Sequence, residues 1–247
     1  MDNDTCKLCN GNLFTLYEDE KGYTVSKPCI CREQRIAENR LKFASIPIAY
    51  KGMLLKNFNW QIYLKSDSRQ LISVAIEILK KYLSSMDMNK LGGIGMYIYS
   101  NAKGSGKTRL AASIANELMD KHSTQVKFAV STKILAEIKK TYENRNEEYT
   151  ESRLMNDLFL AQVLIIDDFG TEKISDWVNE KFFDIINERY LNKKITIFTS
   201  NLSIDELPHD ARIKSRIKER AVLIKFPEED IRERISEKLN VDYLDIK

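Results

Sequence analysis

The stretch YIYSNAKGSGKTRL, residues 97–110, decides the fold. Its apolar start predicts a β-strand, and a turn with two glycines then leads into a helix that begins near Lys107 and Thr108. A phosphate-binding loop has the pattern G-x-x-x-x-G-K-[ST], in which backbone N–H groups surround the phosphates, the lysine reaches the β- and γ-phosphates, and the hydroxyl binds Mg²⁺. The candidate nucleotide-binding residues are Asn101, Gly104, Ser105, Gly106, Lys107, Thr108 and Arg109.

Asn101 stands where the pattern has its first glycine. If that position needs a positive φ, asparagine is among the non-glycine residues that tolerate it best. Taken alone, the imperfect motif leaves a chance strand–turn–helix as an alternative to a nucleotide site.

A second motif, VLIIDDFG at 163–170, favours the nucleotide site. Its β-forming run delivers Asp167 and Asp168 to the carboxyl end of a strand, the edge at which open α/β sheets bind ligands. We expect Asp167, together with Thr108, to hold magnesium, and Asp168 to orient or deprotonate a water molecule. Either acid alone is compatible with a helix cap or a solvated carboxylate, but the pair follows the loop in the expected order.

Two further motifs are polar and basic. ITIFTSN, residues 195–201, predicts a strand that places Asn201 beside a γ-phosphate, although an ordinary turn residue is an alternative. The helix predicted over 211–221 carries Arg212, Arg216 and Arg220 on one face. An arginine from a neighbouring subunit can neutralise charge on a γ-phosphate, whereas the alternative is a solvated basic face.

The remaining pattern predicts an α/β domain with a parallel sheet covered by helices on both faces. Leu71, Val74, Ile78 and Tyr82 recur at helical spacing and indicate a helix before the first strand. Strands are expected at 94–100, 126–130, 163–170, 195–201 and 222–226, and helices at 107–121, 132–142, 153–160, 176–192 and 211–221.

Composition limits the possible functions. The chain has 247 residues with a net charge of +3, so nucleic acid would be contacted through local patches and not by a polycation. We find no apolar run near the ~18 residues of a membrane span, and the polar start MDNDTCKLCN is unlike a secretory signal. These features predict a soluble, cytoplasmic protein without a membrane partner.

All four cysteines, Cys6, Cys9, Cys29 and Cys31, fall within the first 31 residues. Two close pairs suit a tetrahedral Zn²⁺ site, and metal ligation would supply folding energy to a module too small to bury a core. Disulfides or inert thiols are the alternatives, and the Cys-x-Cys spacing of the second pair makes a zinc-knuckle geometry less certain. We therefore expect a small zinc-binding helical module over 1–45, a linker over 46–66 and an ATPase domain over 67–247.

Together these motifs resemble the bacterial and phage replicative helicase loaders of the DnaC/DnaI type, in the initiator/loader branch of the AAA+ ATPases. The segments that carry the resemblance are GSGKTRLAASIANEL, LIIDDFG, FDIINERYLNKKITIFTSNLS, RIKSRI and FPEEDIRERI, within residues 90–235. The cysteine pairs and CREQRIAENRLKFASIPIAY resemble the zinc-bearing front end of many such loaders. The resemblance implies a five-stranded sheet in the order 5-1-4-3-2.

The resemblance also implies roles for individual residues. Lys107 and Thr108 would form Walker A, Asp167 and Asp168 Walker B, and Asn201 sensor 1. Arg216 would be the arginine finger, with Arg212 second, and Arg232 would be the sensor 2 arginine. Over 132–150, contacts to single-stranded DNA would come from Lys133, Lys139, Lys140 and Tyr142, although a lysine-rich helix face is usually only solvated.

The implied activity is that of an ATP-dependent loader, which binds a hexameric DnaB-type helicase and places it on single-stranded DNA. Asp168 stands where many AAA+ ATPases have glutamate, and Asn101 departs from the loop pattern, so we expect slow, switch-like hydrolysis. The cofactors would be ATP, Mg²⁺ and Zn²⁺. A transposition helper ATPase of the IstB type is the near alternative, since it shares the core motifs but generally lacks the paired cysteines. A non-catalytic helicase-binding adaptor is the third reading.

Overall fold

The computed structural model describes residues 6–84, 92–143 and 150–244. They form two compact units, Met1–Ala44 and Ser45–Lys247. In the described part of the chain, none of the helices combines the length and the apolar character needed to cross a membrane.

The first unit contains a β-hairpin and a helix. Strands β1 (Phe14–Glu18) and β2 (Thr24–Pro28) pair antiparallel, and helix α1 spans Arg32–Ala44. The carboxylate of Asp19 accepts hydrogen bonds from the backbone N–H groups of Lys21 and Tyr23, both at 2.9 Å, and closes the turn. The predicted helix is confirmed, and it is accompanied by a β-hairpin that was not predicted. The hairpin was missed because its two strands, FTLYE and TVSKP, are mostly exposed and have no continuous apolar run.

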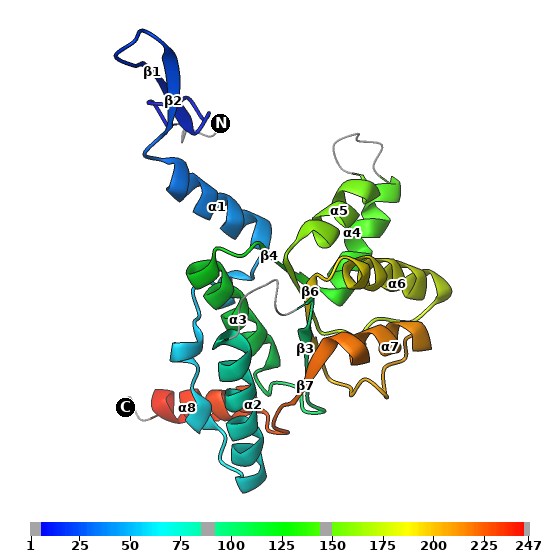
Figure 1. Cartoon of the computed structure of the whole chain (residues 1–247). Helices are drawn as coiled ribbons and strands as arrows, with labels where there is room; N and C mark the ends of the chain where they lie inside the picture. The colour runs from blue at the N-terminus through cyan, green and yellow to red at the C-terminus, as the bar shows by residue number, and fades with distance from the viewer. Residues whose placement is uncertain (1–5, 85–91, 144–149, 245–247) are drawn as a thin grey trace. The chain divides into compact units, whose positions relative to one another are not determined.

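The second unit is built on a five-stranded parallel sheet (Figure 1). The strand order is β4-β5-β6-β3-β7. When the strands of this sheet are numbered 1 to 5 along the chain, this order reads 5-1-4-3-2 from the opposite edge. The strands are β3 (Gly95–Tyr99), β4 (Val126–Val130), β5 (Val163–Asp167), β6 (Ile195–Ser200) and β7 (Ala221–Lys225).

Helices cover both faces of this sheet (Figure 1). All residues of β5 and β6 are buried, as expected for central parallel strands that have helices on either side. One face carries α2 (Ser66–Ser84) and α3 (Lys107–His122), and α8 (Ile231–Leu244) follows β7. The other face carries α4 (Ser131–Glu143), α5 (Glu151–Leu160), α6 (Asp176–Leu191) and α7 (Ala211–Arg220). The predicted α/β class is confirmed.

Helix α2 exists as predicted, but its buried stripe differs by one position from the predicted one. Ile72, Ala75, Leu79 and Tyr82 are buried, whereas Val74 is 54% exposed. Both sets of residues repeat at helical spacing, so periodicity alone could not select the face that packs.

The segment expected to act as a linker packs on the sheet domain. It forms three short 3₁₀ turns, at Ile48–Tyr50, Leu55–Asn57 and Trp60–Ile62. Asn116 of α3 donates hydrogen bonds to the carbonyl oxygens of Tyr50 at 2.8 Å and Met53 at 2.9 Å. These bonds fix the segment against the helix that follows the candidate nucleotide loop.

One charged side chain lies inside the core. Arg189 of α6 is 1% exposed, and burial lowers its pKa to about 9. Its guanidinium donates to the carbonyl oxygens of Leu158 and Ala161, at 2.6 and 2.8 Å, and to the Thr196 hydroxyl at 2.9 Å. The five donors of an arginine suit this use, and the residue joins the end of α5 to the start of β6.

Candidate functional site

The loop between β3 and α3 holds a buried lysine. Lys107 is 5% exposed, and its Nζ donates to the carbonyl oxygens of Ser100 at 3.2 Å and Ala102 at 2.8 Å and to Ser105 Oγ at 3.1 Å. Burial, which disfavours the charged form, lowers the pKa of Lys107 to about 8. Among the described residues, the hydrogen bonds of this buried cation go to neutral oxygens, and such a cation is suited to receive an anion inside the loop.

Glycines shape this loop. Gly104 and Gly106 have φ values of 69° and 100°, in the left-handed region that favours glycine. A Cβ on Gly104 would lie 2.1 Å from the Asp230 carboxylate. Asn101 is not among the described residues with positive φ, so this position does not require the tolerance that we considered for asparagine.

The two acids lie at the end of β5. Asp167 is the last residue of the strand and is 4% exposed, and its Oδ1 accepts a 2.6 Å hydrogen bond from Thr199 Oγ1. Burial raises the pKa of Asp167, whereas hydrogen bonds from Thr199 and Thr108 and the charge of Lys107 act in the opposite direction. The structure therefore brings Lys107, Thr108 and Asp167 together.

Asp168 lies just beyond the strand, in a left-handed conformation with φ of 55°. This conformation costs a non-glycine residue about 1–3 kcal/mol unless its surroundings support it. Here the backbone N–H of Asp168 donates to Thr199 Oγ1 at 3.0 Å, and its carbonyl accepts from Ser131 at 3.0 Å and Thr171 at 2.8 Å. The negative charge of Asp168 raises the pKa of Lys107 more than that of Asp167 does.

Asn201 follows directly after β6, at the same edge. Ser200 before it accepts the Ser100 N–H at 3.2 Å, next to the start of the loop. Tyr97 Oη donates to the Leu202 carbonyl at 2.8 Å and fixes the chain after Asn201. The supporting roles of Thr199 and Tyr97 were not foreseen, because their partners lie far away in the sequence.

Arg232 stands in the first turn of α8, which is anchored on the loop. The N–H of Ile231 donates to the Gly104 carbonyl at 3.1 Å, and the Asp230 carboxylate accepts the Arg232 N–H at 2.9 Å. The charge of Arg232 lowers the pKa of Lys107. The exposed arginine thus lies on the side of the domain that holds the lysine.

The other arginines lie against α6. Arg216 Nε donates to Asn187 Oδ1 at 2.8 Å, and its guanidinium lies 4.6 Å from the ring centre of Phe183. Arg212 pairs with Asp210 at 3.0 Å, and its side chain is 63% exposed. The contacts of Arg216 among the described residues come from α6 and α7, so the candidate fingers do not join the Lys107 cluster within one chain.

The helix α4 exposes basic and aromatic side chains. Lys139 Nζ lies 5.1 Å from the ring centre of Trp177, and Tyr142, which is 56% exposed, packs edge-on against the same tryptophan. Lys133 is exposed, and Lys140 pairs with Glu137 at 2.6 Å. These side chains lie on one helix, whereas residues 144–149 of the predicted stretch lie outside the described residues.

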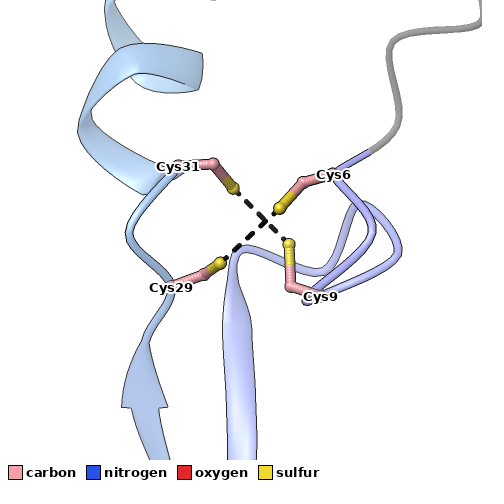
Figure 2. A group of neighbouring side chains, drawn as sticks. All are labelled: Cys6, Cys9, Cys29 and Cys31. Atoms are coloured by element: carbon pink, nitrogen blue, oxygen red, sulfur yellow. Dashed lines mark hydrogen bonds between the residues drawn. The ribbon is translucent and has the colours of Figure 1, made fainter.

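The four cysteines come together in the first unit (Figure 2). Their Sγ atoms all lie within 4.8 Å of one another, with Cys6 and Cys29 at 3.8 Å and Cys9 and Cys31 at 3.5 Å. Thiolates about 2.3 Å from a tetrahedral Zn²⁺ stand roughly 3.8 Å apart, so this donor set fits zinc. Backbone N–H groups of Leu8 and Cys9 lower the pKa of the Cys6 thiol to about 7, whereas burial and the neighbouring thiols raise the pKa of the Cys31 thiol to about 12.

Comparison with known proteins identifies the family. A model of the IstB-like ATP binding protein family matches residues 14–222, most of the chain. The chain belongs to this family. The match begins after Cys6 and Cys9, so the first cysteine pair lies outside it.

Several relatives are named replicative helicase loaders. The replicative helicase loader DnaC of Escherichia coli K12 is 29% identical over 133 residues, which cover 54% of this chain and 51% of the relative. DnaC of Buchnera aphidicola is 30% identical over 197 residues, which cover 79% of this chain and 75% of the relative. The chain thus spans about half the length of the E. coli protein.

The fold is confirmed by a solved structure. The crystal structure of the DnaC helicase loader superposes with a TM-score of 0.60 at 22% identity, covering 73% of this chain and 100% of that chain. At this identity the likeness concerns the fold alone, and it confirms the predicted α/β fold.

Proposed function

We propose that this chain is an ATP-dependent loader, which binds a replicative hexameric helicase of the DnaB type and places it on single-stranded DNA. The observation that carries the proposal is the gathering of Lys107, Thr108 and Asp167 at one sheet edge, in a chain that also carries a four-thiolate cluster. The names of the relatives support the same role.

The chain's own residues suggest how ATP would be bound and cleaved. Lys107 and the amides of the loop would hold the β- and γ-phosphates. Magnesium, bound by the Thr108 hydroxyl and the Asp167 carboxylate, would neutralise phosphate charge. Asp168 would orient the attacking water and accept its proton as the water attacks the γ-phosphate and the bond between the γ-phosphate and ADP breaks. Asn201 would steady the γ-phosphate, and Arg232 would contact it from α8.

Hydrolysis would be slow and would act as a switch. Asp168 is one methylene shorter than the glutamate in many relatives of this superfamily, and its carboxylate therefore reaches less far towards the water. The left-handed backbone of Asp168 sets where its side chain begins, but it does not lengthen that side chain. ATP binding would favour assembly of loaders, and hydrolysis would release them from the helicase.

Assembly would use an arginine in trans. In the single chain Arg216 is held by Asn187 and Phe183, whereas the side chain of Arg212 is 63% exposed. We propose Arg216 as the finger and Arg212 as the second candidate. The exposed face of α4, with Lys139 and Tyr142, would contact the backbone and bases of single-stranded DNA.

The first unit would contact the helicase. Apolar side chains on its surface include Leu16 and Ile30, which are 73% and 86% exposed. Exposed apolar groups on such a small unit favour a protein partner. Zinc, bound by the four thiolates, would supply the folding energy of the unit.

The decisive experiment measures the mass of mixtures of the chain with its cognate replicative helicase, with and without a non-hydrolysable ATP analogue. We expect a complex that forms with the wild-type chain and depends on the cysteine cluster, tested with a Cys9→Ser, Cys29→Ser double variant. A Lys107→Met variant should lose the response to nucleotide. Failure of the wild-type chain to bind the helicase in either state would reject the loader proposal.

A second candidate is a transposition helper ATPase, favoured by the match to the IstB-like family. Such a protein would bind a transposase in place of the helicase. The same mass measurement with a transposase encoded beside the gene distinguishes the two functions. A non-catalytic adaptor would show no ATP binding, and wild type would then behave like Lys107→Met.

A further inference from the structure

The segment before α2 contacts the candidate nucleotide loop through one hydrogen bond. Tyr63 Oη donates to the carbonyl oxygen of Ser105 at 2.7 Å, across 42 positions of sequence. Tyr63 is 1% exposed, and burial raises the pKa of its hydroxyl, which therefore stays protonated and able to donate. A Cβ on Gly106 would lie 2.9 Å from the same hydroxyl.

The orientation of one peptide group follows from this contact. The peptide between Ser105 and Gly106 is trans, so the Gly106 N–H points opposite to the Ser105 carbonyl. Because Tyr63 holds that carbonyl, the Gly106 N–H is directed to the other side of the loop. The Gly106 carbonyl in turn accepts the Leu110 N–H at 2.9 Å in the first turn of α3. The peptide groups on both sides of Gly106 are thereby fixed.

Tyr63 is itself firmly held. Its ring packs edge-on against Phe226, with ring centres 5.7 Å apart, and the Phe226 N–H donates to the Tyr99 carbonyl at 2.7 Å at the end of the sheet. The next two residues, Leu64 and Lys65, donate their N–H groups to the Glu229 carboxylate at 3.3 and 3.1 Å. Tyr63 is therefore held in place by contacts of its ring and of the two residues that follow it.

A second contact joins the same segment to the start of α3. The guanidinium of Arg109 lies 5.5 Å from the ring centre of Phe58, and its Nη2 lies 3.5 Å from the Asn57 carbonyl. Arg109, which we expected to bind nucleotide, is thus directed towards this segment.

We propose that Tyr63 is a positioning residue for the nucleotide site, which turns the Gly106 N–H towards the phosphates by holding the Ser105 carbonyl on the opposite side. This inference rests on the proposed ATP site. The ligand class is a nucleoside di- or triphosphate, since a correctly directed amide hydrogen bonds to phosphate oxygens. Without the Tyr63 hydroxyl, the peptide could rotate and the loop would lose one preorganised donor.

The test is Tyr63→Phe in the full chain, with Tyr82→Phe as the matched control. Tyr82 is also buried, at 5% exposure, and donates to the Ile94 carbonyl at 2.6 Å, so both variants lose one buried tyrosine hydrogen bond. We expect Tyr63→Phe to weaken ATP and ADP binding roughly threefold to tenfold. The KM for ATP should rise by a similar factor while kcat changes less than twofold, because the amide contacts phosphate in both ground and transition states. Tyr82→Phe should leave both constants within a factor of two of wild type.

The outcomes separate this inference from the proposed function. If wild type binds ATP and Tyr63→Phe binds it equally well, the positioning role is wrong and the ATP site stands. If wild type does not bind ATP, both are wrong. Should Tyr63→Phe fail to fold in a thermal melt, Glu229→Ala replaces it. That variant releases Leu64 and Lys65 next to Tyr63, and unchanged ATP affinity in it would overturn the inference.

Discussion

Replacing Lys107 by methionine should change both the pH dependence of folding stability and the response to nucleotide. Burial lowers the pKa of Lys107 from 10.5 to about 8, and each unit corresponds to about 1.4 kcal/mol. The charged lysine therefore costs at most about 3.5 kcal/mol of folding stability at pH 7, and about 2 kcal/mol after solvent screening at the edge of the loop. Methionine removes this cost, but it leaves the Ser100 and Ala102 carbonyls without their donor, about 1 kcal/mol each.

The two effects nearly cancel at pH 7, so the informative measurement is the pH dependence. Between pH 8 and 10.5 the unfolded wild-type chain binds a proton at Lys107 that the folded chain has released. Wild-type stability should therefore rise with pH in this window relative to Lys107→Met, by about 2 kcal/mol in total. This contribution is complete above pH 10.5 and is lost as the pH falls through 8. Urea unfolding of both proteins from pH 7 to 10.5 measures it.

The effect of nucleotide on thermal stability is a second test of Lys107. Magnesium and ATP should raise the melting temperature of wild type and leave Lys107→Met unchanged, since the ligand stabilises only the state that binds it. Lys121→Met is the control and should keep the ATP response, because Lys121 lies on the same helix but its side chain is 63% exposed and pairs with Glu117. A stability difference between wild type and Lys107→Met that is flat from pH 7 to 10.5 would refute the assignment of a buried, charged lysine.

Three further changes test other parts of the structure. Thr199→Val should destabilise the fold by about 1.5–3 kcal/mol in urea unfolding and slow ATP hydrolysis, because the Asp167 carboxylate and the Asp168 N–H lose a shared hydrogen-bond partner. Thr199→Ser keeps the hydroxyl and should preserve hydrolysis. Gly95→Ala should prevent normal folding by circular dichroism, because its Cβ would stand 1.8 Å from the Thr196 carbonyl, whereas Gly22→Ala meets nothing within 4 Å and should fold despite its positive φ. A strong zinc chelator should abolish the structure of Met1–Ala44 while the thermal transition of Ser45–Lys247 persists. A measured zinc content far from one ion per chain would contradict a zinc site at the four cysteines.

The sheet domain could be predicted from sequence because its signals are local. Apolar runs such as VLIID and ITIFTS are long enough to mark buried strands, and each ends in polar residues at the edge that binds ligands. The predicted and observed bounds of these elements differ by only a few residues. Lys107, Thr108 and Asp167 therefore came together as the pattern indicated.

The supports of the site could not be predicted because they join distant residues. Tyr63 reaches Ser105 across 42 positions, and Glu229 binds the N–H groups of Leu64 and Lys65 across about 165. Tyr63 lies outside the quoted motifs, and Glu229, although it lies within FPEEDIRERI, gives no signal of such a contact. The left-handed backbone of Asp168 was missed for a related reason, since its support comes from Ser131 and Thr199 on other elements.

Three unfavourable features meet at this edge of the sheet. Lys107 is charged and buried, Asp167 is a buried acid whose pKa is raised, and Asp168 has a left-handed backbone. A fold selected for stability alone would replace them with apolar or flexible residues. A magnesium-bound triphosphate would relieve the first two, because it brings negative charge to the lysine and positive charge to the acid. The cost built into this loop is therefore the reason that nucleotide should stabilise this chain strongly.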